Sequence, residues 1–374
     1  MDEQEAAAAR RAILSGWVTQ GPEVAAFERE FAQAVGAAHA CASSSCTTAL
    51  HLALLALGVG HGDEVITVSH SFIATANAIR YCGAMPVFVD IDLATFNIDP
   101  ALVEAAIGPR TKAILAVHQI GMPCDLPALT AIAARHGVPL VEDAACAVGS
   151  ELEWQGGWQP IGRPHGDIAC FSFHPRKLLS TGDGGMLTTN NIDLDRRFRL
   201  LRQHGMSVPD TVRHTSSQVI FEEYPVTGYN YRMTDIQAAI GREQLKRLPS
   251  IVARRRQLAA RYEGGLRSID GIVIPCEPAW ARSNWQSYAV RIGAWIDQRT
   301  FMQRMLDAGI ATRRGVMNVH REPAFQAGTW RAGSALSRGE EAQDTAVVLP
   351  LFHQLTDADQ DRVIDTVARV VRNF

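Results

Sequence analysis

A single lysine, Lys177, stands between the end of a predicted strand and a glycine-rich turn in the stretch "FSFHPRKLLSTGDGG", residues 171–185. An amine held near a cation or in apolar surroundings loses part of its proton and can attack an aldehyde. Ser172, five residues earlier, could bind an anion, and the glycines would let the backbone approach a ligand closely. By itself, the same pattern is also that of a surface lysine entering a loop.

A phosphate could bind where a helix is predicted to begin, in "SSSCTTAL", residues 43–50. Thr47 or Thr48 could cap this helix. A helix N-terminus presents free backbone N–H groups and a partial positive charge, and both favour a phosphate. A plain helix cap explains the same residues, so this signal is weak alone.

An apolar strand in "PLVEDAACAVGS", residues 139–150, ends in Glu142 and Asp143. A carboxylate there could cap a helix, bind a metal or pair with a buried cation. We expect no metal site, because no histidine or second acid follows at a suitable ligand spacing. Ala144 and Ala145 would leave room for a flat group against the backbone.

Together these stretches provide an amine that could bind an aldehyde, a carboxylate that could bind a ring nitrogen, and a helix N-terminus that could bind a phosphate. Pyridoxal phosphate offers those three groups, and its ring nitrogen must stay protonated for the ring to accept electrons. The three signals therefore predict a pyridoxal phosphate site more strongly than any one of them does.

The elements that must position these residues alternate between strands and helices. Helical spacing is seen in 47–58 and 126–137, between short runs rich in β-branched residues. The predicted strands are 64–68, 86–90, 113–117, 138–142, 168–173 and 185–189. This alternation indicates an α/β fold with a mainly parallel sheet, which binds ligands at the carboxyl ends of its strands.

A change of pattern near residue 266 predicts two domains, 1–265 and 266–374. A helix over 233–248 is expected to be interrupted at Pro249 before it resumes. Beyond 266 we expect a smaller α+β domain. Its predicted elements are a strand over 287–292 and helices near 297–308 and 356–372.

Composition excludes several other classes of protein. The 374 residues are 47% hydrophobic and 20% charged, with a formal net charge of -3, so nucleic acid binding is not indicated. Seven cysteines without a CxxC pair favour a reducing compartment. The N-terminus lacks the apolar stretch of a secretion signal, and no run of eighteen apolar residues could span a membrane. We therefore expect a cytoplasmic enzyme.

Long motifs in a fixed order resemble the DegT/DnrJ/StrS family of pyridoxal-phosphate-dependent sugar aminotransferases. The motifs occupy residues 15–32, 63–79, 86–100, 142–150, 171–187 and 228–241. The resemblance implies the aspartate-aminotransferase-like fold (fold type I), whose large domain has a mostly parallel seven-stranded sheet. It also implies a homodimer with shared active sites. The proline-containing segment that opens many relatives is missing or very short here.

The resemblance also implies which side chains bind the cofactor's ring. Lys177 would form the Schiff base, and Asp143 would bind the pyridine nitrogen. Phe72 would stack on one face of the ring, and Ala145 would pack on the other. Without the resemblance, a core aromatic would be the favoured role of Phe72. Cys146 stands where many relatives have Gln or His bound to the phenolic oxygen. Because a thiol donates weakly, we expect an altered absorbance or pH profile and retained activity.

The phosphate would be bound by residues from three other places in the chain. The resemblance assigns this role to Ser172 and to the segment Ser45, Cys46 and Thr47. Asn230, in "GYNYRM", would reach the phosphate from the neighbouring subunit, or would be only a turn residue.

The implied reaction is a two-stage amino transfer from a donor, expected to be glutamate, through pyridoxamine phosphate to a keto sugar, expected to be nucleotide-linked. "ATRRG", residues 311–315, and His320 are candidates for contact with the diphosphate or sugar. Alternatives are an aminocyclitol or other natural-product ketone as acceptor, a non-aminating sugar-modifying enzyme, and a non-catalytic protein. The presence of Lys177 and Asp143 argues against the last two.

Overall fold

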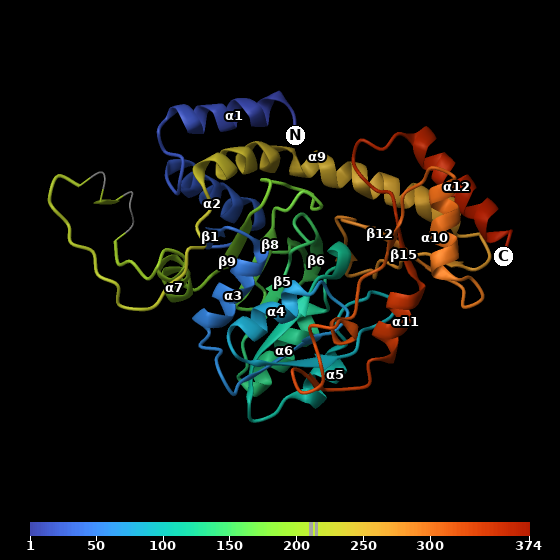
Figure 1. The fold of residues 1–374 in the computed structure, drawn as a ribbon, viewed down its shortest axis with the longest axis horizontal. Coiled ribbons are helices and arrows are strands. Elements are labelled where there is room, and N and C mark those ends of the chain that lie inside the picture. The colour runs from blue at the N-terminus through green and yellow to red at the C-terminus, as the bar shows by residue number, and fades with distance from the viewer. Residues whose placement is uncertain (209–211, 214–215) are drawn as a thin grey trace.

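A mixed sheet of eight strands forms the centre of the molecule (Figure 1). The computed structural model describes residues 1–208, 212–213 and 216–374. The strands lie in the order β1-β9-β8-β5-β4-β2-β3-β14, with both pairings of β9 antiparallel and the others parallel. Their bounds are β1 His39–Ser43, β2 Glu64–Val68, β3 Met85–Val89, β4 Thr111–Val117, β5 Leu140–Asp143, β8 Ile168–Ser172, β9 Gly185–Thr189 and β14 Arg331–Ala332.

This architecture confirms the predicted α/β class with a mostly parallel sheet. The sheet has one strand more than the seven expected, because β14 adds two residues at the β3 edge. Nearly all residues of the inner strands are buried, as in a sheet that is covered on both faces.

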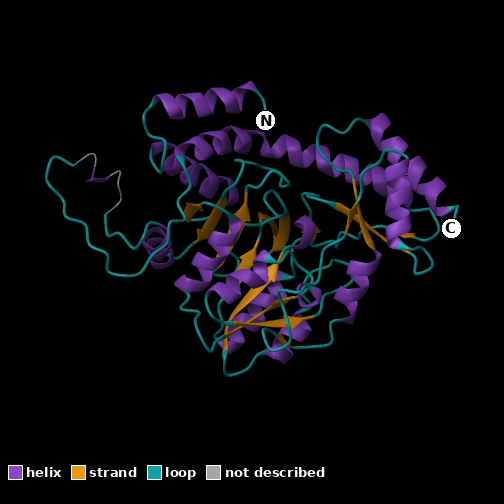
Figure 2. Cartoon of the chain, in the orientation of Figure 1, coloured by secondary structure: helices purple, strands orange, loops and turns teal. Residues whose placement is uncertain are grey.

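Helices cover both faces of the sheet (Figure 2). Neighbouring residues of β2 show this directly, because Val65 packs in one core cluster and Ile66 in the other. Residues of α3, α4 and α7 belong to the cluster of Val65, and residues of α2, α5, α6 and α9 to that of Ile66. The helices are α1 Glu3–Leu14, α2 Pro22–Val35, α3 Cys46–Ala56, α4 Ala74–Tyr81, α5 Pro100–Ala106, α6 Leu126–His136, α7 Ile192–Arg202 and α9 Asp235–Leu266.

The helix α9 runs through Pro249 without a break, so the predicted interruption is wrong. Proline costs a helix one hydrogen bond and a clash with the preceding turn. Residues on both sides of it, Leu248 and Ile251, are buried in the main core cluster, and this packing holds the helix together. As a result, α9 extends from α1 and α2 to the C-terminal helices (Figure 1).

The C-terminal part of the chain forms a second, four-stranded sheet of order β10-β12-β15-β13 with its own apolar cluster. It also sends β14 to the central sheet and β11 to a small sheet with β6 and β7. The division at residue 266 stays a prediction. The bounds are β6 Glu151–Trp154, β7 Gly157–Pro160, β10 Ile272–Val273, β11 Ala281–Arg282, β12 Tyr288–Ile292, β13 Arg313–Arg314, β15 Ala346–Leu349, α10 Gln298–Asp307, α11 Ser337–Thr345 and α12 Asp357–Val371.

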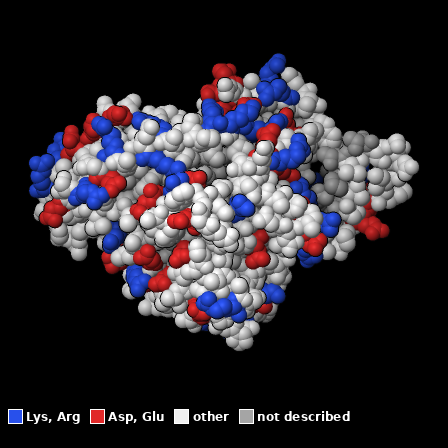
Figure 3. Space-filling model, turned by 180° about the vertical axis from the view of Figure 1, so that it is seen from behind, with Lys and Arg blue, Asp and Glu red and all other residues white. Residues whose placement is uncertain are grey.

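Basic and acidic side chains are interspersed on the face shown in Figure 3. That face therefore presents no single-sign field that would steer a charged polymer. Among the described residues, no helix has both the length and the apolar character needed to cross a membrane.

Two buried histidines predict a loss of stability in acid. His70 is 1% exposed, neither of its ring nitrogens has a hydrogen-bond partner among the described residues, and burial lowers its pKa to about 3. Burial likewise lowers the pKa of His51 to about 4. The unfolded chain therefore binds these protons below pH 6.5, its ordinary histidine pKa, while the folded chain does not.

We expect His70 alone to cost about 2 kcal/mol of stability between pH 6.5 and pH 5, since each pH unit in that window is worth about 1.4 kcal/mol. Urea unfolding of the wild type and of His70→Leu at pH 7 and pH 5 measures this. The variant should lose less stability on acidification by about that amount. An equally steep loss in the variant would contradict the assignment.

Candidate active site

Lys177 lies in a turn just after β8, with its amide donating to the carbonyl of His174 at 2.9 Å. Its Nζ donates a hydrogen bond to Sγ of Cys146 at 3.0 Å. Burial by itself lowers the pKa of Lys177, but the adjacent Cys146 sulfur outweighs it, and the pKa is raised. The expected loss of the lysine proton is therefore wrong for the chain without a ligand, because an acceptor stands beside the amine.

Asp143 is the last residue of β5 and is buried. Its Oδ2 accepts a hydrogen bond from Thr75 Oγ1 at 2.8 Å, and its Oδ1 accepts one from the Ala145 amide at 3.2 Å. Burial raises the pKa of Asp143, while the nearby charge of Lys177 opposes that rise. Lys177 and Asp143 are therefore near enough for the charge of each to affect the pKa of the other. A buried cation in contact with Asp143 would keep this carboxyl group ionised.

Phe72 lies in the loop between β2 and α4, and its carbonyl accepts a hydrogen bond from the Thr75 amide at 3.1 Å. Thr75 is the residue that binds Asp143, so this loop brings Phe72 to the same site. Its side chain is 68% exposed, so the alternative of a core aromatic is wrong. An exposed ring beside a buried carboxylate is available to pack on a flat ligand.

The helix α3 begins at Cys46, and its cap is Ser45 rather than Thr47 or Thr48. Ser45 accepts from the Thr48 amide at 3.2 Å, and the Thr48 hydroxyl accepts from the Ser45 amide at 3.0 Å. The backbone amides of Cys46 and Thr47 lie in the first turn, where a helix provides no acceptor for them. This leaves two donors for an anion.

Gly185 allows the start of α3 to approach the sheet. A Cβ at Gly185 would lie 2.7 Å from the Cys46 backbone nitrogen, which is too close for any other residue. Gly185 is also the register partner of Ser172 on β8, so Ser172 lies beside the start of α3. The Ser172 hydroxyl accepts only a long bond, 3.4 Å, from the His174 amide.

Asn230 is exposed, and its Oδ1 accepts from Nε of Arg232 at 3.3 Å. The next residue, Tyr231, accepts from the Ser44 amide at 2.8 Å through its carbonyl. Asn230 is therefore next to the turn that leads into α3 of its own chain, and the structure does not bring its side chain into contact with the other candidate residues.

His320 is anchored within the chain. Its Nδ1 lies 2.7 Å from Oγ of Ser69, three residues before Phe72, and its Nε2 lies 3.0 Å from Glu340. Arg313 and Arg314 form the exposed strand β13. The segment before and around His320 is thus attached to the loop that carries Phe72.

Sequence reasoning missed two partners of the site. Thr75, which binds Asp143, stands in a small-residue run that carries no signal by itself. The second is a buried pair, Glu142 with His118, whose Nε2 lies 3.0 Å from Glu142 Oε2. Strand alternation could have shown that Glu142 points to the opposite face of the sheet from Asp143, but its pairing with His118 depends on the fold.

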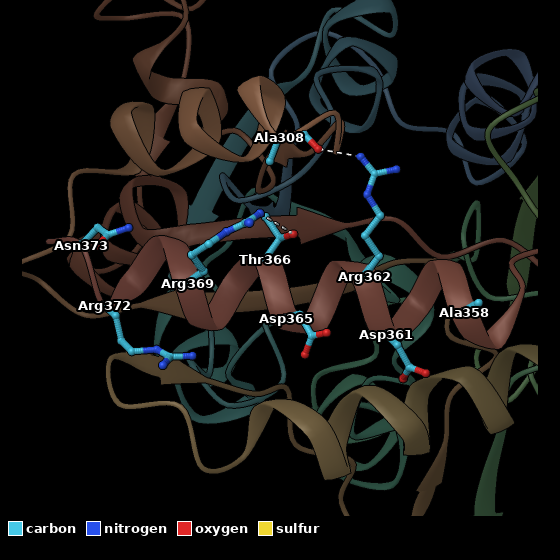
Figure 4. Close-up of a pocket in the computed structure, with 9 residues that line it drawn as sticks. All are labelled: Ala308, Ala358, Asp361, Arg362, Asp365, Thr366, Arg369, Arg372 and Asn373. Atoms are coloured by element: carbon cyan, nitrogen blue, oxygen red, sulfur yellow. Dashed lines mark hydrogen bonds between the residues drawn. The ribbon is translucent and has the colours of Figure 1, made fainter.

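Two surface hollows contain none of these residues. The first, with a volume of about 970 Å³, follows the exposed side of α12 (Figure 4) and is lined by Ala308, Ala358, Asp361, Arg362, Asp365, Thr366, Arg369, Arg372 and Asn373. The second, of about 420 Å³, lies at the amino end of β5, near Pro139 and His165. Sites of parallel sheets form at the opposite, carboxyl ends. No group of three or more metal-ligating side chains occurs among the described residues.

The residues at the carboxyl ends of β5 and β8 fit pyridoxal phosphate. The unpaired first-turn amides of α3 suit its phosphate, the buried carboxylate of Asp143 suits its protonated ring nitrogen, and the amine of Lys177 suits its aldehyde. With the fold, they define a pyridoxal-phosphate-dependent aminotransferase of fold type I. The chain belongs to the DegT/DnrJ/EryC1/StrS aminotransferase family, whose model matches residues 1–368.

Known proteins resemble the chain over nearly its whole length. It is 40% identical to the spore coat polysaccharide biosynthesis protein SpsC of Bacillus subtilis (strain 168), over 96% of this chain and 92% of SpsC. The crystal structure of the aminotransferase TlmJ from Streptoalloteichus hindustanus has a TM-score of 0.90 at 37% identity, covering 100% of this chain and 97% of that one. DesV of S. venezuelae, solved with a ketimine intermediate, has a TM-score of 0.89 at 37% identity, covering 99% and 94%.

Proposed function

We propose that the protein transfers an amino group, from glutamate, to a keto sugar that is linked to a nucleotide. The observation that carries the proposal is the shared compartment of Lys177, Asp143 and the start of α3. It occurs on a chain whose relative SpsC is named for polysaccharide biosynthesis.

Each side chain has a defined task in this reaction. Pyridoxal phosphate, when bound, supplies an aldehyde that takes up the amino group and a ring that accepts the electrons of the broken C–H bond. Lys177 holds the cofactor covalently at rest and then moves a proton from the α-carbon of the donor. Asp143 keeps the proton on the ring nitrogen. Phe72 and Ala145 would pack against the ring.

The phosphate is the anchor of the cofactor in this proposal. We assign the phosphate to the amides of Cys46 and Thr47 and to the hydroxyls of Ser45 and Ser172; the start of α3 and the register of Ser172 with Gly185 support this assignment. Ser45 caps α3, and the missing side chain of Gly185 leaves room for the first turn of this helix beside the sheet. We therefore expect these donors to be positioned before the cofactor binds.

Arg313 and Arg314 are the side chains that we assign to the diphosphate of the acceptor. Both are exposed, and they precede the segment that His320 attaches to the loop of Phe72. A guanidinium group binds phosphate through paired hydrogen bonds, which suits this role.

A panel of acceptors tests the proposal. Purified protein is loaded with pyridoxal phosphate and glutamate, and then offered nucleotide-linked keto sugars, free keto sugars and a non-sugar cyclic ketone, with the aminated product measured by mass. We expect amination of a nucleotide-linked keto sugar to have the highest kcat/KM. Amination of the non-sugar ketone alone would overturn the sugar assignment and leave the aminotransferase class intact.

A homodimer with shared sites is part of the proposal. The described residues between α7 and α9 include a stretch that extends away from the rest of the chain (Figure 1), and among them Val219 and Phe221 are 85% and 89% exposed. Exposed apolar side chains of this kind are typical of a surface that another chain covers. Asn230, at the base of the same segment, would then reach the phosphate of the partner's site. Seven free thiols support a cytoplasmic location.

Exchange of the thiol in the site tests the role of Cys146. Its sulfur already contacts Lys177, and as a weak donor it would stabilise the phenolic oxygen of the cofactor less than an amide does. We expect Cys146→Gln to stay active within about tenfold and to shift the absorbance of the bound cofactor and the pH at which that absorbance changes. A spectrum and pH profile identical to those of the wild type would remove the assigned role.

A further inference from the structure

The contact between Lys177 and Cys146 joins a nucleophile to an oxidisable sulfur. Nζ and Sγ are 3.0 Å apart, the two residues come from different segments, and within the part of the chain that the structure describes the amine has no other hydrogen bond. A second thiol, Cys46, is the first residue of α3 and lies near the same amine. One amine and two thiols therefore share the compartment at the ends of β5 and β8.

We propose that Lys177 and Cys146 form a reversible covalent bond under mild oxidation. This modification would prevent Lys177 from binding the cofactor. Peroxide first oxidises the sulfur of Cys146 by two electrons, giving a sulfenic acid and one water. The amine of Lys177 then attacks that sulfur, the N–S bond forms, and the S–O bond breaks. The hydroxyl leaves with the proton of the amine as a second water.

The local electrostatics favour the second step. The charge and hydrogen bond of the Cys146 sulfur raise the pKa of Lys177 against the effect of burial. Oxidation to a neutral sulfenic acid removes the contribution of the Cys146 sulfur, while burial still lowers the pKa of Lys177 and the nearby Asp143 carboxylate still raises it, so the pKa of the amine falls. The amine thus becomes a better nucleophile once its target has formed.

Cys46 is the competing nucleophile, because a sulfenic acid also condenses with thiols. Cys46 is buried, and burial with the nearby carboxylate of Asp143 raises the pKa of its thiol well above the ordinary value. A thiol that stays protonated is a poor nucleophile. The amine, already in contact with the sulfur, is therefore favoured over Cys46.

The bond would act as a reversible block. Lys177 cannot bind the aldehyde of the cofactor while its nitrogen is bonded to sulfur, and reduction by a thiol would restore both side chains. Bound cofactor would occupy the same nitrogen and protect the site. The block would therefore act on newly made or cofactor-depleted protein.

Mass spectrometry of the full chain without cofactor tests the inference. After brief treatment with hydrogen peroxide, we expect a product about 2 Da lighter than the starting chain. In a tryptic map, the Lys177 and Cys146 peptides should be joined and cleavage after Lys177 lost. Dithiothreitol should restore the original mass and the uptake of pyridoxal phosphate.

Two variants separate the possible cross-links, since a disulfide between the two cysteines has the same mass. Cys46→Ser should still form the lighter product, and Cys146→Ser should not. Products that only gain oxygen, or a lighter product that disappears in Cys46→Ser, would overturn the inference. The cross-link is measured without cofactor or substrate, so its failure is distinct from a failure of the proposed amino transfer.

Discussion

Replacement of Lys177 by alanine is expected to lower turnover by about 10⁴-fold or more, because the variant loses both the covalent anchor and the group that moves the proton. Among the described residues of the site, Lys177 is the one side chain with an amine that could form a Schiff base with an aldehyde. Its present partner, the Cys146 sulfur, would remain in place in the variant. The phosphate donors at the start of α3 also remain, so the variant should still bind the cofactor without a covalent link.

Borohydride measures this loss directly. Reduction of the wild type should fix the cofactor to the chain so that it survives denaturation, and reduction of Lys177→Ala should leave it free. The chain provides matched controls, because its other two lysines are Lys112 and Lys246. Lys112 is an exposed residue of β4, and Lys246 is exposed on α9 and paired with Glu243.

Lys112→Ala and Lys246→Ala should behave as the wild type in both activity and fixation. If Lys177→Ala kept the cofactor covalently bound, another lysine would carry the link and the whole assignment of the site would be wrong.

Much of the fold could be predicted because the buried strands have apolar runs with clear ends. The strand predicted over 64–68 matches β2, and the one over 185–189 matches β9. The strand β1, with the sequence HACAS, was not predicted, since small residues there give no β-branched run. It is held by its antiparallel pairing with β9, which is a tertiary contact.

The predicted interruption at Pro249 is wrong for a related reason, because tertiary packing outweighs a local preference. Local propensity correctly lists proline as a helix breaker, but the burial of Leu248 and Ile251 outweighs that cost. The two-residue strand β14 is likewise too short to show in the sequence and depends on the edge of β3.

The candidate site likewise contains some residues that the sequence indicates and others that only the fold brings together. The positions of Lys177 and Asp143 near the carboxyl ends of neighbouring strands could be predicted, because both follow apolar strand runs with clear ends, whereas their roles stay predictions. Thr75, the hydrogen-bond partner of Asp143, could not, because a hydroxyl in a helix is common and only the fold brings it to the carboxylate. The cap was predicted at Thr47 or Thr48 and is Ser45, since serine and threonine are both common helix caps and several of them stand together here.

Asp143→Asn is expected to lower kcat by about 10²–10³-fold while the cofactor remains covalently bound. The carboxylate's charge is what would keep the proton on the ring nitrogen, and a neutral amide cannot do this. The fold should tolerate the change. The amide oxygen can still accept from the Ala145 amide, and the amide nitrogen can donate to the Thr75 hydroxyl in place of the bond that Asp143 now accepts.

Turnover and borohydride fixation, measured together, therefore distinguish Lys177→Ala from Asp143→Asn. Lys177→Ala loses turnover and borohydride fixation together, whereas Asp143→Asn loses turnover and keeps fixation. Thr75→Val serves as the control for the carboxylate's surroundings, because it removes the hydrogen bonds of the Thr75 hydroxyl to Asp143 and Ser71 and leaves the charge, and its loss of kcat should be about tenfold or less. A wild-type kcat in Asp143→Asn would show that the charge at 143 does not act on the ring nitrogen, and the carboxylate would then be only a structural partner of Thr75.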